Sequence, residues 1–177
     1  MDEDERAVRR TGLGMMLLFW LLVLAIGAWW FHGYLEQRRN PNAHLVHAVA
    51  GEGGDVVLQR NVSGHFVATG RINGEPVEFL LDTGATYLAV SADLAARLGL
   101  ERGRPAFFHT ANGRVQGYLT EIDQVSLGGL ATHNVRGSIN PGMSGDAALL
   151  GMSFLNRFDI EIRGNEMVLR APQRPVQ

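Results

Sequence analysis

FLLDTGATYL, residues 79–88, places an ionisable side chain at the end of an apolar run. Three large apolar residues in succession predict a buried strand, and Asp82 ends it. Thr83, Gly84 and Ala85 follow, and the glycine permits a sharp turn. Asp and Gly are also common in ordinary turns, so a structural role at the strand end is the alternative to a chemical one.

The surrounding segment, residues 55–170, predicts a mainly antiparallel β fold. Short β-rich runs are separated by dipeptides that favour tight hairpin turns, because such turns need residues that tolerate positive φ. Two short helices are predicted as well, one over residues 92–99 with Ser91 as its N-cap, the other over residues 151–158. The four hairpin dipeptides are Asn73-Gly74, Asn112-Gly113, Gly128-Gly129 and Gly164-Asn165.

A second motif lies at ALLGMSFL, residues 148–155, where Leu149 and Leu150 precede Gly151 at the start of a short helix. The Asp-Thr-Gly-Ala stretch, this second motif and the hairpin between them together resemble the signatures of aspartic proteases. The resemblance is to the retropepsin-like type, including membrane-tethered bacterial proteases, and covers roughly residues 55–170. It implies a single-lobe, closed β fold.

The resemblance also implies a flap, a hairpin that covers the active site. It falls on residues 109–117, with Ala111, Asn112 and Gly113 at its tip. A hairpin with glycine at its tip is suited to opening for substrate and closing over it. Tyr87, Phe107 and Phe108 lie near the loop and the flap, and we expect them to serve in packing.

The chain has a single Asp-Thr-Gly and the length of one small domain after its N-terminal segments. By resemblance, two identical chains each supply one Asp82, and Thr83 helps to join the two loops across the twofold axis. Two carboxylates about 3 Å apart share one proton, so one activates a water while the other protonates the carbonyl oxygen. The implied function is an aspartic endopeptidase that works as a homodimer on proteins or peptides.

Two positions depart from the retroviral pattern. Thr86 and Met152 stand where those relatives usually carry an Asp and an Arg that form an ion pair near the dimer interface. Both partners are absent together, so we expect a different dimer contact. Two other functions remain open: a catalytically silent binding or assembly module of the same fold, and a β-rich periplasmic scaffold whose motifs are accidental.

Other candidate sites are weaker. Asp146 lies in a Ser/Gly-rich loop, where a turn role is favoured over that of a second carboxylate. Asp159 and Glu161 alternate with isoleucines, which predicts the exposed face of a strand. His44 and His47 lack a third ligand and a helix signal, so no metal or other cofactor is expected. The chain has no cysteine and no G-x-S-x-G motif, which argues against thiol and serine hydrolase chemistry.

Residues 12–31 are uncharged and apolar, and as a helix they span about 30 Å, the thickness of a bilayer core. The run ends in Trp29, Trp30 and Phe31, as in an aromatic belt, which favours an uncleaved transmembrane anchor in contact with lipid over a signal peptide. The predicted organisation is therefore a tail (1–11), an anchor (12–31), a linker (32–54), a protease domain (55–170) and a C-terminal tail (171–177).

Three arginines precede the anchor and two follow it, which favours a cytoplasmic N-terminus. We therefore expect a single-pass protein of the bacterial inner membrane with a periplasmic protease domain. The formal net charge of −2 and the lack of a basic patch argue against nucleic acid as a partner.

Overall fold

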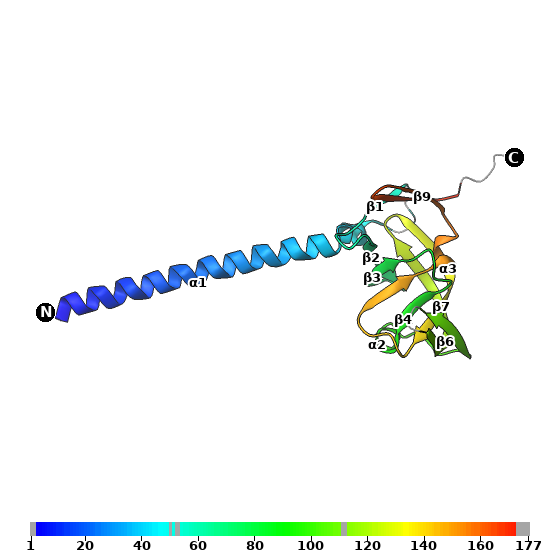
Figure 1. Cartoon of the computed structure of the whole chain (residues 1–177), viewed down its shortest axis with the longest axis horizontal. Helices are drawn as coiled ribbons and strands as arrows, with labels where there is room; N and C mark the ends of the chain where they lie inside the picture. Colours follow the sequence, from blue (N-terminus) through cyan, green and yellow to red (C-terminus); the bar gives the residue numbers. More distant parts are fainter. Residues whose placement is uncertain (1–2, 50, 52–53, 111–112, 173–177) are drawn as a thin grey trace. The chain divides into compact units, whose positions relative to one another are not determined.

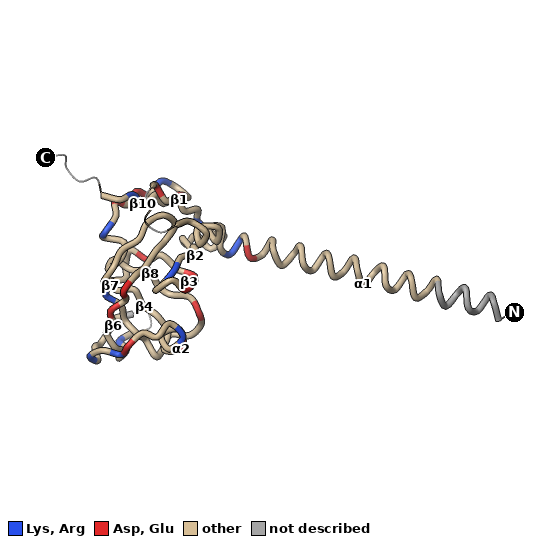
Figure 2. Tube along the Cα trace, turned by 180° about the vertical axis from the view of Figure 1, so that it is seen from behind, with Lys and Arg blue, Asp and Glu red and all other residues tan. Residues whose placement is uncertain are grey.

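The computed structural model describes residues 3–49, 51, 54–110 and 113–172, and the chain forms two compact units, residues 1–37 and 38–177. Nearly all of the first unit is helix α1 (Glu3–Arg39). Outside the N-terminal turns drawn in grey, this helix is tan in Figure 2 until a red and a blue segment close to its C-terminal end. The stretch from Gly12 to Arg39 is long and apolar enough to cross a membrane, a test that a signal sequence also passes.

The second unit is a closed β structure (Figure 1), which confirms the predicted fold class. Its main sheet has the order β2-β3-β8-β4-β7-β6-β5. Because β2 also pairs with β6, the first six strands of that order form a closed ring, and β5 is attached to it through β6. The strands are β2 (Phe66–Ile72), β3 (Glu75–Leu81), β4 (Leu88–Ser91), β5 (Pro105–Thr110), β6 (Gly113–Leu127), β7 (Leu130–Asn140) and β8 (Ala147–Leu150).

Local sequence signals predict most of the turns correctly. Asn73 and Gly74 have φ values of 50° and 87°, as the tight turn between β2 and β3 requires. Gly128-Gly129 joins β6 to β7 in the same way. Of the dipeptide predicted to turn at Asn112-Gly113, Gly113 pairs with Thr110 and begins β6. Asn112 and Ala111 lie outside the described residues.

Both short helices of this unit are present. Helix α2 (Ala92–Arg97) begins after Ser91, whose Oγ accepts a hydrogen bond from the Leu94 N–H at 3.0 Å. Helix α3 (Met152–Leu155) follows Gly151. A third helical turn, the 3-10 helix η1 (Ala43–His47), contains His44 and His47, for which no helix was predicted.

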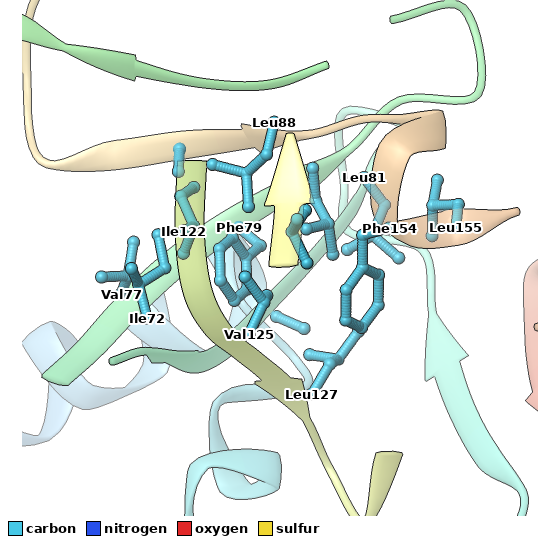
Figure 3. Packing of buried hydrophobic residues seen from close by; sticks show 14 of the residues in the cluster. Ile72, Val77, Phe79, Leu81, Leu88, Ile122, Val125, Leu127, Phe154 and Leu155 are labelled. Atoms are coloured by element: carbon cyan, nitrogen blue, oxygen red, sulfur yellow. The ribbon is translucent and has the colours of Figure 1, made fainter. Parts of the chain in front are cut away.

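The closed sheet surrounds an apolar core. Figure 3 shows Phe79, Leu88, Ile122 and Phe154 from different elements packed together, and all four are fully buried. Strand β3 contributes alternate residues to this core, as its period-2 pattern predicts. The strand that precedes Asp82 is therefore fixed by packing from Val77 to Leu81.

A smaller sheet has the order β1-β10-β9, formed by β1 (Val56–Gln59), β10 (Glu166–Arg170) and β9 (Asp159–Arg163). Here the predicted exposure of β9 is wrong for two residues. Glu161 is partly buried and pairs with Arg170 and Arg163, whereas Ile162 is 46% exposed. Hydrogen bonds from Arg170 and Arg163 hold the pKa of Glu161 below its ordinary value. On β9, the ion pairs of Glu161 therefore influence side-chain exposure more than the alternation of apolar residues does.

The predicted linker, residues 32–54, is wrong in its first part. Residues 32–39 continue helix α1, and Asn40 and Asn42 are buried in the second unit. The Asn42 amide donates to the carbonyls of Gln59 at 2.9 Å and Val67 at 2.7 Å, and its oxygen accepts the Gln59 N–H at 2.8 Å. This one side chain therefore joins β1 to β2, and with them the small sheet to the closed one.

We predict that Asn42→Ala lowers the free energy of unfolding by about 3 kcal/mol, because it removes the hydrogen-bond partner of the buried Val67 carbonyl and of partly buried backbone groups of Gln59. The measurement is denaturant unfolding of the full-length chain in detergent micelles. Asn165→Ala serves as the control, since Asn165 is exposed in the turn before β10. Equal effects of the two substitutions would contradict a structural role for Asn42.

Candidate active site

Asp82 is placed by the pairing of the two strands that carry the sequence motifs. Strands β3 and β8 run parallel, with Leu81 opposite Leu150. One residue further on, the Asp82 N–H donates to the Leu150 carbonyl at 3.1 Å. The structure thus brings the Asp-Thr-Gly-Ala loop and the Leu-Leu-Gly motif side by side, although 63 residues (86–148) lie between the two in the sequence.

The loop after β3 folds back on its own aspartate. The Gly84 N–H donates to Asp82 Oδ1 at 2.8 Å, and the Ala85 N–H donates to the Asp82 carbonyl at 3.2 Å. Within the described part of the chain, Oδ2 accepts no hydrogen bond. Asp82 and Ala85 are half-buried, whereas Thr83 and Gly84 are exposed. One carboxylate oxygen is therefore oriented by the loop, and the other is available to a water or a second group.

The N-terminal end of α3 holds the loop from its other side. The N–H groups of Met152 and Ser153 donate to the carbonyls of Ala85 at 2.7 Å and Thr86 at 2.9 Å. The Ser153 hydroxyl accepts the Leu88 N–H at 3.0 Å. Ser153 was not predicted from the sequence. The one pattern that could have indicated it is a small polar residue within an otherwise apolar helical turn. Backbone and hydroxyl groups here connect the elements that an Asp–Arg pair connects in the retroviral pattern.

Gly151 permits this close approach. A Cβ at this position would lie 2.6 Å from the Ala85 carbonyl oxygen and closer still to that of Tyr87. Glycine is therefore required here by its small size, since no side chain fits between α3 and the loop. Of the two residues before it, Leu150 is fully buried in the core and Leu149 is half-buried and faces a cleft.

That cleft has a volume of about 310 Å³ and lies between the aspartate loop and strand β5. Gly84 to Tyr87 form one wall, and Phe107, Phe108 and His109 form another. The expected packing is present for Tyr87 and Phe108, which are half-buried and meet edge to face at 5.9 Å, although both also line the cleft. It is wrong for Phe107, which is 58% exposed. The apolar wall therefore stands open beside the loop.

The hairpin of β5 and β6 stands at the predicted flap position. Its pairs run from Pro105–Tyr118 to Thr110–Gly113, so Gly113 is at the end of the described ladder. Residues 111 and 112 of the predicted flap tip are not among those described.

The rival carboxylate Asp146 lies at the opposite end of β8 from Gly151. Four strand residues lie between Asp146 and Gly151, which makes five steps, or about 17 Å at a strand's rise of roughly 3.3 Å per residue. Asp146 is exposed and forms an ion pair with Arg97 at 3.3 Å. Within this chain it therefore cannot share a proton with Asp82.

The family described as "gag-polyprotein putative aspartyl protease" matches residues 68–157, from β2 to just past α3. This range holds the aspartate loop, the flap hairpin and the second motif. The chain belongs to the retropepsin-like aspartic protease family. A crystal structure of a retropepsin-like aspartic protease from Rickettsia conorii is similar at 31% identity and a TM-score of 0.58, covering 68% of this chain and 92% of that one.

Two curated proteins are also similar to this retropepsin-like chain. One is encoded in the region 5′ to cobV in Sinorhizobium sp., with 33% identity over 120 residues, covering 66% of this chain and 52% of that protein. The other is RP867 of Rickettsia prowazekii, with 31% identity over 110 residues, covering 60% of this chain and 47% of that protein. The chain spans about half the length of these two relatives.

We predict that Gly151→Ala destabilises the domain by about 1 to 3 kcal/mol, because the added methyl group displaces the aspartate loop from α3. Thermal and denaturant unfolding of the full-length chain measure the effect. Gly142→Ala is the matched control, since the nearest atom to a Cβ there is the tip of the Asn140 side chain at 3.3 Å. If both variants unfold like the unsubstituted chain, the close packing at Gly151 is not what holds the loop.

Proposed function

We propose that this chain is a membrane-anchored aspartic endopeptidase in which Asp82 of each of two copies forms the catalytic pair. The observation that carries the proposal is the geometry of Asp82. Its Oδ1 is fixed by the loop, its Oδ2 accepts no hydrogen bond from the described residues, and Gly84 to Tyr87 of the same loop line a cleft beside the predicted flap hairpin. No carboxylate lies among the described residues that line this cleft, and we infer that the second one comes from another copy of the chain.

A homodimer supplies that carboxylate without a second motif, because a twofold axis brings the same residue from both chains together. The exposed Thr83 and Gly84 form the face on which a second loop would rest. Strand β9 offers another contact, since its outer edge has no partner among the described strands and unpaired edges favour pairing with another chain. The exposed Ile162 on this strand adds apolar area to the interface.

The chemistry follows from the shared proton. Two carboxylates about 3 Å apart hold one proton between them, so the ionised one draws a proton from the attacking water. The protonated one donates to the carbonyl oxygen of the scissile peptide bond as the tetrahedral intermediate forms. A peptide fits the cleft as an extended chain beside β5, the outermost strand of the main sheet, because an exposed strand edge presents backbone groups for pairing.

The helix from Gly12 to Arg39 supports the membrane anchor, with its uncharged part long enough for a bilayer core. Anchoring confines the copies to a plane and raises their effective concentration, which favours a dimer even where its contacts are weak. The arginine balance supports a position of the protease domain on the periplasmic side of a bacterial inner membrane.

We predict that the full-length chain in detergent micelles cleaves an unfolded protein such as casein, and that Asp82→Asn abolishes this cleavage. The amide keeps the size of the side chain but cannot act as the base. Asp146→Asn is the control that retains activity. Absence of cleavage by the unsubstituted chain across acidic and neutral pH would favour the catalytically silent module instead.

Mixing unsubstituted chains with Asp82→Asn chains distinguishes an active site shared by two chains from an active site that is complete in each chain. After subunit exchange with a large excess of Asp82→Asn chains, we expect activity per unsubstituted chain to fall to a small fraction, because mixed dimers hold one ionisable carboxylate. The rate of substrate cleavage before and after exchange measures this. Activity that stays constant per unsubstituted chain would show that one copy suffices.

A further inference from the structure

Two arginines flank the cleft, and each lies against an aromatic residue of its wall. The Arg114 guanidinium lies 4.0 Å from the centre of the Phe107 ring, and that of Arg136 lies 6.0 Å from the centre of the Tyr87 ring. Both arginines are exposed. Phe107 belongs to the flap side of the cleft and Tyr87 to the aspartate loop, so positive charge stands on both sides of the opening.

Neither arginine is neutralised within the described residues. Four other arginines have carboxylate partners, namely Arg39, Arg97, Arg163 and Arg170. Arg60 and Arg71 instead donate to backbone carbonyls. Glu121 stands opposite Arg136 in the ladder of β6 and β7, yet no ion pair forms between them. A guanidinium that stacks on a ring keeps its N–H groups free at the edge, and these groups match a carboxylate in shape.

From this arrangement we infer that Arg114 and Arg136 select peptide segments in which an apolar residue is flanked by Asp or Glu. The apolar side chain fills the cleft against Tyr87, Phe108 and Leu149. The flanking carboxylates pair with the two guanidinium groups at its ends. This inference rests on the proposed function, since it names the substrate class of the same cleft.

Peptide segments in which Lys or Arg flanks the apolar residue bind less favourably, for two reasons. A Lys or Arg beside the apolar residue would meet like charge from Arg114 or Arg136, which costs affinity. The lining itself offers no carboxylate among its described residues to hold such a cation. The catalytic pair carries negative charge, but it acts on the scissile bond, whereas the arginines act on the positions beyond it.

The test measures binding, so that it does not depend on turnover. Three peptides that differ only in the residues flanking one Phe, with Glu, Gln or Lys there, are titrated against full-length Asp82→Asn in detergent micelles by fluorescence anisotropy at low salt. We expect the Glu peptide to bind about three- to tenfold more tightly than the Gln peptide, and the Lys peptide to bind most weakly. Arg114→Gln and Arg136→Gln should each reduce the Glu-to-Gln ratio about two- to fivefold.

Arg102→Gln is the matched control, because Arg102 is also exposed and lies over a ring, that of Tyr118 at 5.4 Å, away from this cleft. If Arg102→Gln lowers the Glu-to-Gln ratio as much as Arg114→Gln and Arg136→Gln do, the preference reflects general attraction between positive surface charge and the acidic peptide. That result would overturn the inference. So would equal binding of the Glu and Gln peptides, or no binding of any peptide. Retained selectivity without cleavage by the unsubstituted chain would overturn the proposed function alone, and cleavage without selectivity would overturn this inference alone.

Discussion

The parallel pairing of β3 and β8 is the contact on which the site depends. It sets Leu81 opposite Leu150, and the hydrogen bond from Asp82 N–H to the Leu150 carbonyl extends the same ladder into the loop. Parallel neighbours need a long crossover, and here the connection contains β4 to β7, which complete the closed sheet. The aspartate therefore reaches its position only when nearly the whole domain has folded.

Features that depend on neighbours in the sequence could be predicted, and those that depend on distant partners could not. The turn at Asn73-Gly74 and the cap at Ser91 follow from the preferences of those residues alone. Asp82 stood out because an ionisable residue ends an apolar run. The parallel pairings of β3 with β8 and of β4 with β7 leave no local signal, since a buried strand looks the same in either orientation.

Aromatic and polar residues near the site show the same limit. Tyr87 and Phe108 were expected to pack. An aromatic residue beside a loop has the same sequence pattern whether it fills a core or lines a cleft, so the sequence did not show that both residues also line the cleft. Asn42 was assigned to a linker because its surroundings are polar and rich in small residues. Its burial follows from three hydrogen bonds to β1 and β2, whose residues lie 17 and 25 positions away. Composition describes the solubility of a segment but not its distant partners.

Because Asn42 is held within the domain, a break in the backbone after it does not by itself separate the two fragments. Residues 38–47 precede the segment that joins η1 to β1, yet their contacts lie within the second unit. A single break between residues 48 and 55 would leave the N-terminal fragment attached through Asn42, the Arg39–Glu78 ion pair at 2.6 Å and the packing of Leu45 against the core. In the proposed anchored enzyme, cleavage of the backbone and departure from the membrane are therefore separate events, and the second requires these non-covalent contacts to open.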